Sequence, residues 1–230
     1  MTATDLFFSC IHQGGFEQRT AILEQLVIAG WTGRDQKAVM AHIEELHRIG
    51  VPPPRKTPII YRVAATLLTQ AETIQVAGRD SSGEVEAVFV SFEDGLWVGL
   101  GSDHTDRKLE AHGITLSKQV CAKPIGTTLW RYNELHEHWD RLQLRSFATI
   151  DGRRRLYQEG VAAHMRSPDD LFALYSGQPR LPFGEVMYGG TLAVHGPIGF
   201  ATLFEMELHD PVLNRTLTHS YVVHDLPIEG

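Results

Sequence analysis

The chain has 230 residues, which is enough for one large domain or two small ones with a sizeable buried core. Hydrophobic residues make up 43% and charged residues 21%, a balance typical of a folded globular protein that excludes disorder for the bulk of the chain. The formal net charge of -7 at pH 7 argues against a nucleic-acid surface as the main function, because phosphate binding requires clustered lysine and arginine.

The low cysteine content is typical of a protein from a reducing compartment. Cys10 and Cys121 are the two cysteines of the chain, so neither a disulfide framework nor a cysteine-based zinc motif is predicted. No basic region precedes the first apolar stretch, and no run of about 18 apolar residues lacks a charge, so we expect neither a signal peptide nor a membrane span. Together these features predict a cytoplasmic protein.

The first predicted element is an amphipathic helix over residues 35–49. Apolar residues recur there at steps of three and four from Val39 to Ile49. Gly50 follows the last of them as a helix stop. The proline run at 52–54 then predicts a turn, after which the periodicity of the sequence changes.

Short segments rich in β-branched and aromatic residues dominate the chain beyond the prolines. The dipeptide Asp151-Gly152 predicts a hairpin turn between two of them. A short helix is predicted at 167–177, where Ser167 can cap the first turn and Gly177 can end the last. The predicted strands are 59–63, 73–76, 85–90, 96–100, 142–150, 191–194, 201–208 and 217–223. This pattern predicts a mostly β (α+β) fold with a few peripheral helices.

The densest polar segment follows the predicted strand that ends at Leu100. It holds seven ionisable residues between positions 103 and 112, and we expect it to run from a loop into the start of a helix. Asp103, Arg107 and Glu110 are four and three positions apart, so on a helix they share one face and can converge on a ligand. The alternative is a solvated helix start with local ion pairs.

Two carboxylates upstream are two positions apart. In a strand Glu84 and Glu86 point to the same face, where they repel each other unless a cation lies between them. We interpret the pair as ligands of a hard divalent cation, with Asp103 as the third oxygen ligand. The alternative is an exposed strand face, and His104 and His112 keep zinc or iron under consideration.

These residues and several later motifs resemble the fumarylacetoacetate hydrolase (FAH) family, in the same order along residues 58–226. The motifs are Glu84-x-Glu86, Ser102-Asp103 with Arg107 and Glu110, Ser117-Lys118, Gly126-Thr127-Thr128, Ser167-Pro168-Asp169-Asp170-Leu171, Gly190-Thr191 and Gly196-Pro197. The phrase from Gly101 to Lys108 is similar to a bacterial branch of unknown function, DUF2848. The resemblance implies a mixed β-sheet roll with a few peripheral helices, in which 58–230 is the catalytic domain and 1–57 is an N-terminal segment or small subdomain that could act as a lid.

The resemblance also implies roles for individual residues. It points to one Mg²⁺ or Mn²⁺ per chain, held by Glu84, Glu86 and Asp103. It implies that a further set contacts the substrate: Arg107, Glu110, Lys118, Gly190 and Thr191. Lys118 is also assigned a catalytic role.

Two departures from the family bear on catalysis. Glu110 stands where the family commonly has glutamine, which implies a raised pKa or a different ligand. The His/Glu dyad of the family's lid has no counterpart, because 62–72 contains no histidine. We expect His104 to act as the replacement acid/base. His42 and Glu45, three apart on the first predicted helix, are a second replacement if that helix covers the site.

The function predicted from this site is metal-dependent chemistry on a small 2-oxo or 2,4-dioxo acid through a metal-stabilised enolate. Carbon–carbon hydrolysis, hydration or dehydration, decarboxylation and tautomerisation all remain open. The alternative is a catalytically inactive FAH-fold protein that binds a metabolite or serves as an accessory subunit, and a purely structural β protein is expected if the acids lie apart. We predict a homodimer, since family members generally associate as dimers, and neither a nucleic-acid nor a membrane partner.

Overall fold

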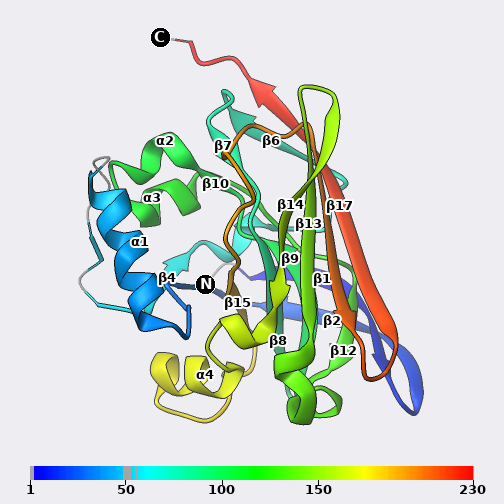
Figure 1. The fold of residues 1–230 in the computed structure, drawn as a ribbon. Helices are drawn as coiled ribbons and strands as arrows, with labels where there is room; N and C mark the ends of the chain where they lie inside the picture. Colours follow the sequence, from blue (N-terminus) through cyan, green and yellow to red (C-terminus); the bar gives the residue numbers. More distant parts are fainter. Residues whose placement is uncertain (1–2, 49–52, 55, 230) are drawn as a thin grey trace.

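The computed structural model describes residues 3–48, 53–54 and 56–229 of the chain (Figure 1). Most of these residues lie in two large mixed sheets. The eight-stranded sheet contains, in spatial order, β2 (Gly15–Leu23), β1 (Thr4–His12), β12 (Thr128–Arg131), β9 (Gly95–Ser102), β8 (Val85–Phe92), β15 (Glu185–Thr191), β3 (Gln25–Gly30) and β4 (Ile59–Val63). The five-stranded sheet contains β14 (Arg153–Val161), β13 (Gln143–Ile150), β16 (Leu203–Asp210), β17 (Arg215–Leu226) and β6 (Thr73–Ala77).

Short ladders and helices complete the described part of the fold. Strand β10 (Thr105–Asp106) pairs with β7 (Ser81–Ser82), and β11 (Lys123–Pro124) pairs with β5 (Leu68–Thr69). The α-helices are α1 (Gln36–Arg48), α2 (Arg107–Glu110), α3 (Ile114–Gln119) and α4 (Pro168–Ser176). The 3₁₀ helices are η1 (Ala65–Leu67), η2 (Tyr132–Glu134), η3 (His136–Arg141) and η4 (Ala162–His164). None of the described helices is long and apolar enough to cross a membrane.

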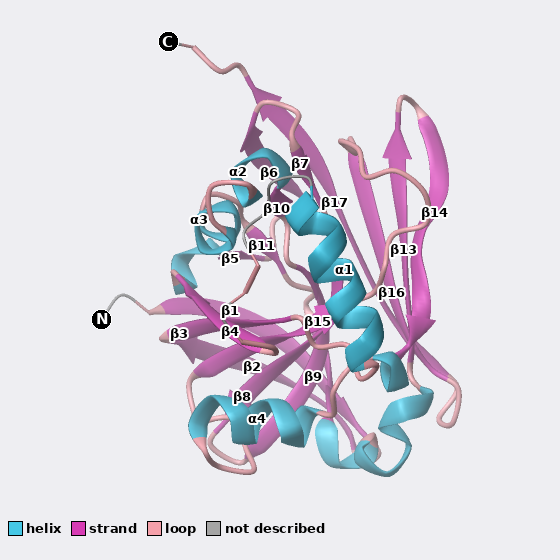
Figure 2. Cartoon of the chain, turned by 60° about the vertical axis from the view of Figure 1, so that its left-hand side comes forward, coloured by secondary structure: helices cyan, strands magenta, loops and turns pink. Residues whose placement is uncertain are grey.

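The predicted mostly β fold with a few peripheral helices is confirmed. In both views α2 and α3 lie across the molecule from the hairpin of β13 and β14 (Figure 1, Figure 2). The hairpin turn is the predicted one, with Asp151 and Gly152 in the left-handed region at φ 50° and 74°. Helix α4 begins and ends as predicted, because Ser167 accepts a hydrogen bond from the Asp170 backbone and Gly177 ends the helix at φ 71°.

Two details of the predicted elements are wrong. The strand predicted at 191–194 is instead β15, which ends at Thr191, because the chain turns out of the sheet after Gly190 at φ 97°. The helix predicted after Leu100 begins only at Arg107, since Asp103 lies between β9 and the short strand β10. Asp103 therefore does not share a helix face with Arg107 and Glu110.

The first 30 residues contribute three strands to the eight-stranded sheet. Strand β1 pairs with β12, and β3 lies between β15 and β4. Sequence analysis did not predict these strands. The proposed boundary after residue 57 falls between α1 and β4, and the division into 1–57 and 58–230 stays a prediction.

Strand β8 separates two apolar cores. Its residues Val85, Ala87 and Phe89 join the core that contains side chains of the five-stranded sheet, and Val88 and Val90 join the core on the opposite face. Every residue of β8 is buried, as expected for a central strand covered on both sides. Glu86 shares the face of Val88, so a charged side chain emerges where the second core ends.

Candidate functional site

The candidate site lies at one end of the β8–β9 hairpin. The two strands pair Glu86 with Gly101, and the Asp103 backbone N–H donates to the Glu84 carbonyl at 3.0 Å. Antiparallel pairing thus brings acids that are 17 or more positions apart to the same sheet end. Carboxylate oxygens of Glu84, Glu86 and Asp103 lie within 4.8 Å of one another, so the structure brings the three predicted metal ligands together.

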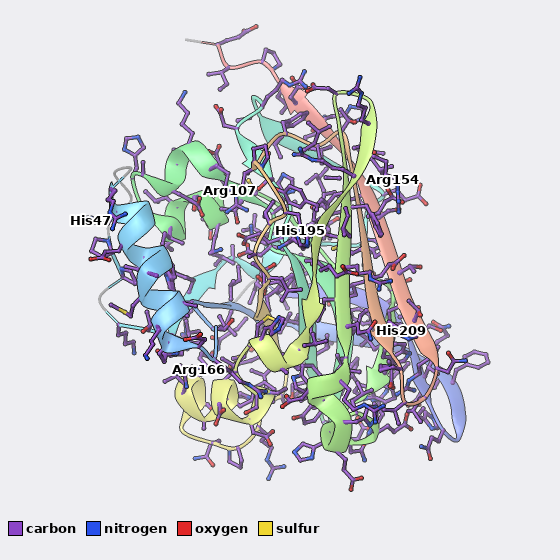
Figure 3. All side chains as sticks on the ribbon, in the orientation of Figure 1. His47, Arg107, Arg154, Arg166, His195 and His209 are labelled. Atoms are coloured by element: carbon purple, nitrogen blue, oxygen red, sulfur yellow. The ribbon has the colours of Figure 1, made fainter. Side chains whose placement is uncertain are left out.

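Two of the predicted substrate-binding cations contact this carboxylate cluster. Lys118 Nζ forms a short hydrogen bond with Asp103 and lies 3.5 Å from Glu84 Oε2. Arg107 Nη1 lies 2.9 Å from Glu84 Oε1 and 3.1 Å from Glu110 Oε1, and its Nε donates to Ser82 at 2.7 Å. Figure 3 shows Arg107 at the start of α2, between this helix and the sheets.

Lys123 is a site residue that the sequence analysis missed. Its ammonium donates to the backbone carbonyls of His104 at 2.6 Å, Lys118 at 2.5 Å and Cys121 at 3.0 Å. An ammonium has three protons, so these bonds use all of them. The signal that could have revealed it is that Lys123 is the single charged residue between positions 120 and 129.

The fixed position of Lys123 leaves one carboxylate oxygen without a hydrogen bond. Asp103 Oδ1 lies 3.3 Å from Lys123 Nζ but accepts no hydrogen bond from the described residues. Asp103 is fully buried, and Lys123 balances the charge of Oδ1 without donating a hydrogen bond to it, so this oxygen keeps lone pairs available for a further ligand. Three clustered carboxylates with such an oxygen fit a hard divalent cation such as Mg²⁺ or Mn²⁺, which prefers oxygen ligands.

The environment of the cluster shifts the pKa values of Glu86 and Asp103 in opposite directions. Burial, together with repulsion from Asp103 and Glu84, raises the pKa of Glu86 well above its ordinary value. Burial also acts to raise the pKa of Asp103, but Lys118 and Lys123 outweigh it and hold that pKa below its usual range. Glu86 is therefore the carboxyl that retains a proton most readily, and Asp103 is the one that stays ionised.

Glu110 lies at the outer side of the cluster. Burial raises the pKa of Glu110 despite the opposing effect of Arg107, which is the direction implied by a glutamate in the place of glutamine. Its side chain is 24% exposed, compared with 0% for Asp103. Solvent therefore reaches the carboxyl of Glu110 and not that of Asp103.

Gly190 holds Glu86 through its backbone. The Gly190 N–H donates to Glu86 Oε2 at 2.7 Å. A Cβ on Gly190 would lie 1.9 Å from Thr32 Oγ1, and the φ of 97° is unfavourable for other residues, so glycine is required here. Thr191 is also close, but its hydroxyl donates to the Val85 carbonyl at 2.7 Å and is therefore directed at the strand rather than at a ligand.

His104 does not point at the carboxylates. Strand-like alternation sends it to the opposite face from Asp103, where Nδ1 lies 2.9 Å from Tyr221 Oη and Nε2 lies 2.9 Å from Ser81 Oγ. Burial, reinforced by Lys123 and Arg107, lowers the pKa of His104 to about 3, so the ring is neutral at ordinary pH. The assignment of His104 as acid/base stays a prediction. The side chains of His42 and Glu45 lie outside the described residues.

An aromatic pair from the N-terminal part of the chain borders the cluster. The Tyr61 ring lies 5.7 Å from Lys118 Nζ, and Trp31 Nε1 donates to Tyr61 Oη at 3.3 Å. Trp31 has a φ of 59°, a left-handed conformation uncommon for a bulky residue. No motif in the sequence predicts that Trp31 and Tyr61 lie beside the site.

Two surface hollows lie away from the carboxylates. One, of about 280 Å³, is lined by residues of β3 and β4 that include Gln25 and Arg62. The other, of about 500 Å³, includes Tyr132, His136 and Asp169, which already hydrogen-bond to one another. Among the described residues the one group of three potential metal ligands is the carboxylate cluster, and neither hollow is lined by it, so the arrangement of ligands identifies the site.

Comparison with known proteins adds a family and a set of structural neighbours. The family model DUF2848, described as a protein of unknown function, matches residues 29–221. No curated protein matches the chain. Fifteen solved chains match its fold, which confirms the FAH-like architecture that the motifs predicted.

Three neighbours illustrate this likeness. A 2-keto-3-deoxy-D-arabinonate dehydratase complexed with magnesium and 2,5-dioxopentanoate has a TM-score of 0.61 at 16% identity, with 91% of this chain and 77% of that chain covered. Yeast ynq8, a fumarylacetoacetate hydrolase family protein, has a TM-score of 0.64 at 15% identity, with 90% and 96% covered. The 4-oxalocrotonate decarboxylase from Pseudomonas putida G7, complexed with calcium and acetate, has a TM-score of 0.53 at 13% identity, with 86% and 76% covered.

Proposed function

The chain belongs to the DUF2848 family, and from the site that it carries in an FAH-like fold we propose that it is a divalent-metal-dependent enzyme acting on a small 2-oxo or 2,4-dioxo acid. The observation that carries the proposal is the convergence of Glu84, Glu86 and Asp103, with Asp103 Oδ1 free of hydrogen bonds among the described residues. The neighbours that include a dehydratase with magnesium and a decarboxylase with calcium support the same class of reaction.

The proposed metal ligands are Glu84, Glu86 and Asp103, which would hold one Mg²⁺ or Mn²⁺. Bound there, the ion would supply a Lewis acid for the carboxylate and keto oxygens of the substrate and would stabilise an enolate. The Gly190 N–H keeps Glu86 in place by donating a hydrogen bond to it. Lys123, together with Lys118, lowers the pKa of Asp103 and so keeps this carboxylate ionised.

Arg107 and Lys118 are the proposed substrate contacts. Lys118 is buried and Arg107 is partly buried, and each pairs with a carboxylate of the cluster, so their positive charge faces the region where an anionic substrate would bind. Positive charge beside a developing enolate lowers the energy of the transition state in a dry site. Thr191 contributes through its backbone in this proposal, because its hydroxyl is directed at Val85.

Two groups are proposed for proton transfer. Glu110 is 24% exposed and so can reach a substrate, and burial raises its pKa, which favours its acting as a proton donor. His104, assigned from the sequence, can exchange a proton only after its bond to Tyr221 or Ser81 opens. The pH profile of turnover separates them, since Glu110→Gln removes a titrating limb if Glu110 acts and leaves the profile unchanged if His104 acts.

An activity screen tests the proposal. Small 2-oxo and 2,4-dioxo acids are incubated with Mg²⁺ or Mn²⁺ and assayed for loss of substrate, with wild type, Asp103→Asn and Glu93→Gln. We expect turnover that falls by at least roughly 100-fold in Asp103→Asn. Glu93 is an exposed carboxylate at the far end of the β8–β9 hairpin, and its variant should match wild type. Equal activity in all three proteins would refute the assignment of Asp103.

A binding protein without turnover is the second candidate function. It is favoured by the engagement of both His104 ring nitrogens and by the three cations that already neutralise much of the carboxylate charge. Such a protein would bind oxalate together with metal and leave every substrate of the screen intact. The predicted homodimer and cytoplasmic location stay predictions, and light scattering of the purified protein tests the former.

A further inference from the structure

The Lys118 ammonium contacts the carboxylates that would bind the metal ion. Its ammonium is bonded to Asp103 and lies 3.5 Å from Glu84, which are two of the three proposed metal ligands. The side chain is 8% exposed, so water does not replace these contacts. A divalent ion that binds Asp103 and Glu84 must therefore displace the ammonium or share its partners.

The charge balance of the site also indicates that a divalent ion would replace Lys118. Among the described residues the site contains four carboxylates and three cations, which leaves one formal negative charge. These groups are Glu84, Glu86, Asp103 and Glu110 with Arg107, Lys118 and Lys123. Without Lys118, and with all four carboxyls ionised, the site would carry two negative charges, which is the amount that a divalent cation neutralises.

The two lysines of the site differ in how they are held. Lys123 is fixed by three backbone carbonyls and cannot leave without losing all three bonds. Among the described residues, the hydrogen bond and ion pairs of Lys118 Nζ are instead all to carboxylates, and the side chain comes from α3 rather than from a β-strand. Its withdrawal therefore breaks no hydrogen bond to the backbone, and the Tyr61 ring, whose centroid already lies 5.7 Å from Nζ, can keep a cation–π contact with it.

We propose that Lys118 is an internal counter-cation of the carboxylate cluster, which holds Asp103 and Glu84 together when no metal is bound and competes with the metal for them. Metal binding then releases the ammonium toward Tyr61 and the substrate. The inference rests on the proposed metal site and adds that the chain itself limits the metal affinity of that site.

The test is the affinity for Mn²⁺, measured by titration calorimetry on wild type, Lys118→Met and Lys108→Met. Methionine keeps the length of the side chain and removes its charge. Lys108 is 72% exposed on α2, so its variant controls for the loss of one positive charge nearby. We expect Lys118→Met to bind Mn²⁺ at least about tenfold more tightly than wild type and Lys108→Met to bind as wild type does.

Melting temperatures provide an independent readout. Without metal, Lys118→Met should melt below wild type, because its carboxylates repel one another without compensation. With saturating Mn²⁺ its melting temperature should rise by more than that of wild type. If Lys118→Met does not fold, Lys118→Gln serves, since its amide can donate to Asp103 without adding charge, and the same increase in affinity is expected.

The outcomes separate the inference from the proposed function. If wild type binds Mn²⁺ and Lys118→Met binds it equally or more weakly, Lys118 only stabilises the position of Asp103. The inference is then overturned, while the metal site stands. If only Lys118→Met binds Mn²⁺, the counter-cation is supported and the wild-type protein is not a metal enzyme under these conditions. If neither protein binds, both the inference and the metal site are refuted.

Discussion

Replacing Glu86 by glutamine should stabilise the metal-free protein at neutral pH and abolish its response to metal. Glu86 is 2% exposed, faces Asp103 and Glu84, and accepts one hydrogen bond from Gly190. Glutamine has the same shape and keeps an acceptor for that bond, so the change removes the charge and little else. The opposite result, destabilisation, is what a purely structural carboxylate would give.

The sign of the effect follows from the raised pKa of Glu86. The folded state holds a proton that the unfolded chain releases above the ordinary carboxyl pKa, so the stability that Glu86 contributes is complete in acid. It is lost as the pH rises through the raised pKa. Glutamine cannot ionise, and wild type should therefore lose more stability than Glu86→Gln as the pH rises above the ordinary carboxyl pKa of 4.5.

The magnitude follows from the same linkage. A carboxyl that the fold keeps protonated costs about 1.4 kcal/mol for each unit by which the pH exceeds its ordinary pKa, so glutamine removes a cost of about 1–3 kcal/mol near neutral pH. For a chain of this length each kcal/mol shifts the melting temperature by roughly 2–4 °C. In the opposite direction, metal at 100 times its Kd stabilises wild type by about 2.7 kcal/mol, an effect that Glu86→Gln should lack.

Thermal melts of wild type, Glu86→Gln and Glu93→Gln check this reasoning. Each protein is melted across the pH range, with and without Mn²⁺ and oxalate. We expect Glu93→Gln, which changes an exposed carboxylate, to stay within about 0.5 kcal/mol of wild type under every condition. A Glu86→Gln protein that melts below wild type without metal, and gains as much as wild type from Mn²⁺, would refute the role of Glu86.

Three further predictions follow from the same geometry. Gly190→Ala should destabilise the fold by about 2–3 kcal/mol, because its Cβ would meet Thr32 Oγ1 at 1.9 Å, and Thr32→Gly should recover part of the loss in denaturant melts. An unchanged midpoint would contradict the clash. Lys123→Met should cost about 3–5 kcal/mol, since three carbonyls and Asp103 lose their cation, and a loss below about 1 kcal/mol would show that water replaces it. His104, with a folded pKa of about 3, should make wild type lose stability as the pH falls below about 6.5, and His104→Gln should lose less; parallel pH profiles would contradict its neutral burial.

The predictable part of the site is the part that depends on local spacing. Glu84 and Glu86 share a face because strand side chains alternate, and this could be predicted without the structure. The same rule sends His104 away from Asp103, so the placement of His104 also followed from alternation once Asp103 was taken as a ligand. The alternation of side chains thus predicts both that the two glutamates lie together and that the histidine points away from Asp103.

The unpredicted part depends on contacts between distant segments. Lys123 has a role only because carbonyls of three separate residues meet at its ammonium, which no local pattern reveals. Strand β1 was missed because Phe7 and Ile11 are exposed apolar residues, so its alternation reads as a continuous apolar run. Trp31 reaches the site through β3, whose pairing with β15 joins positions about 160 apart.

The location of a bound ion tests the central claim most directly. A crystal grown with Mn²⁺ and oxalate, measured at a wavelength where manganese scatters anomalously, shows the position of the metal independently of any atomic interpretation. We predict one anomalous peak per chain, about 2.0–2.6 Å from oxygens of Glu84, Glu86 and Asp103. No peak at the cluster, or a peak bound by other residues with Lys118 still on Asp103, would contradict a metal-dependent site in this protein.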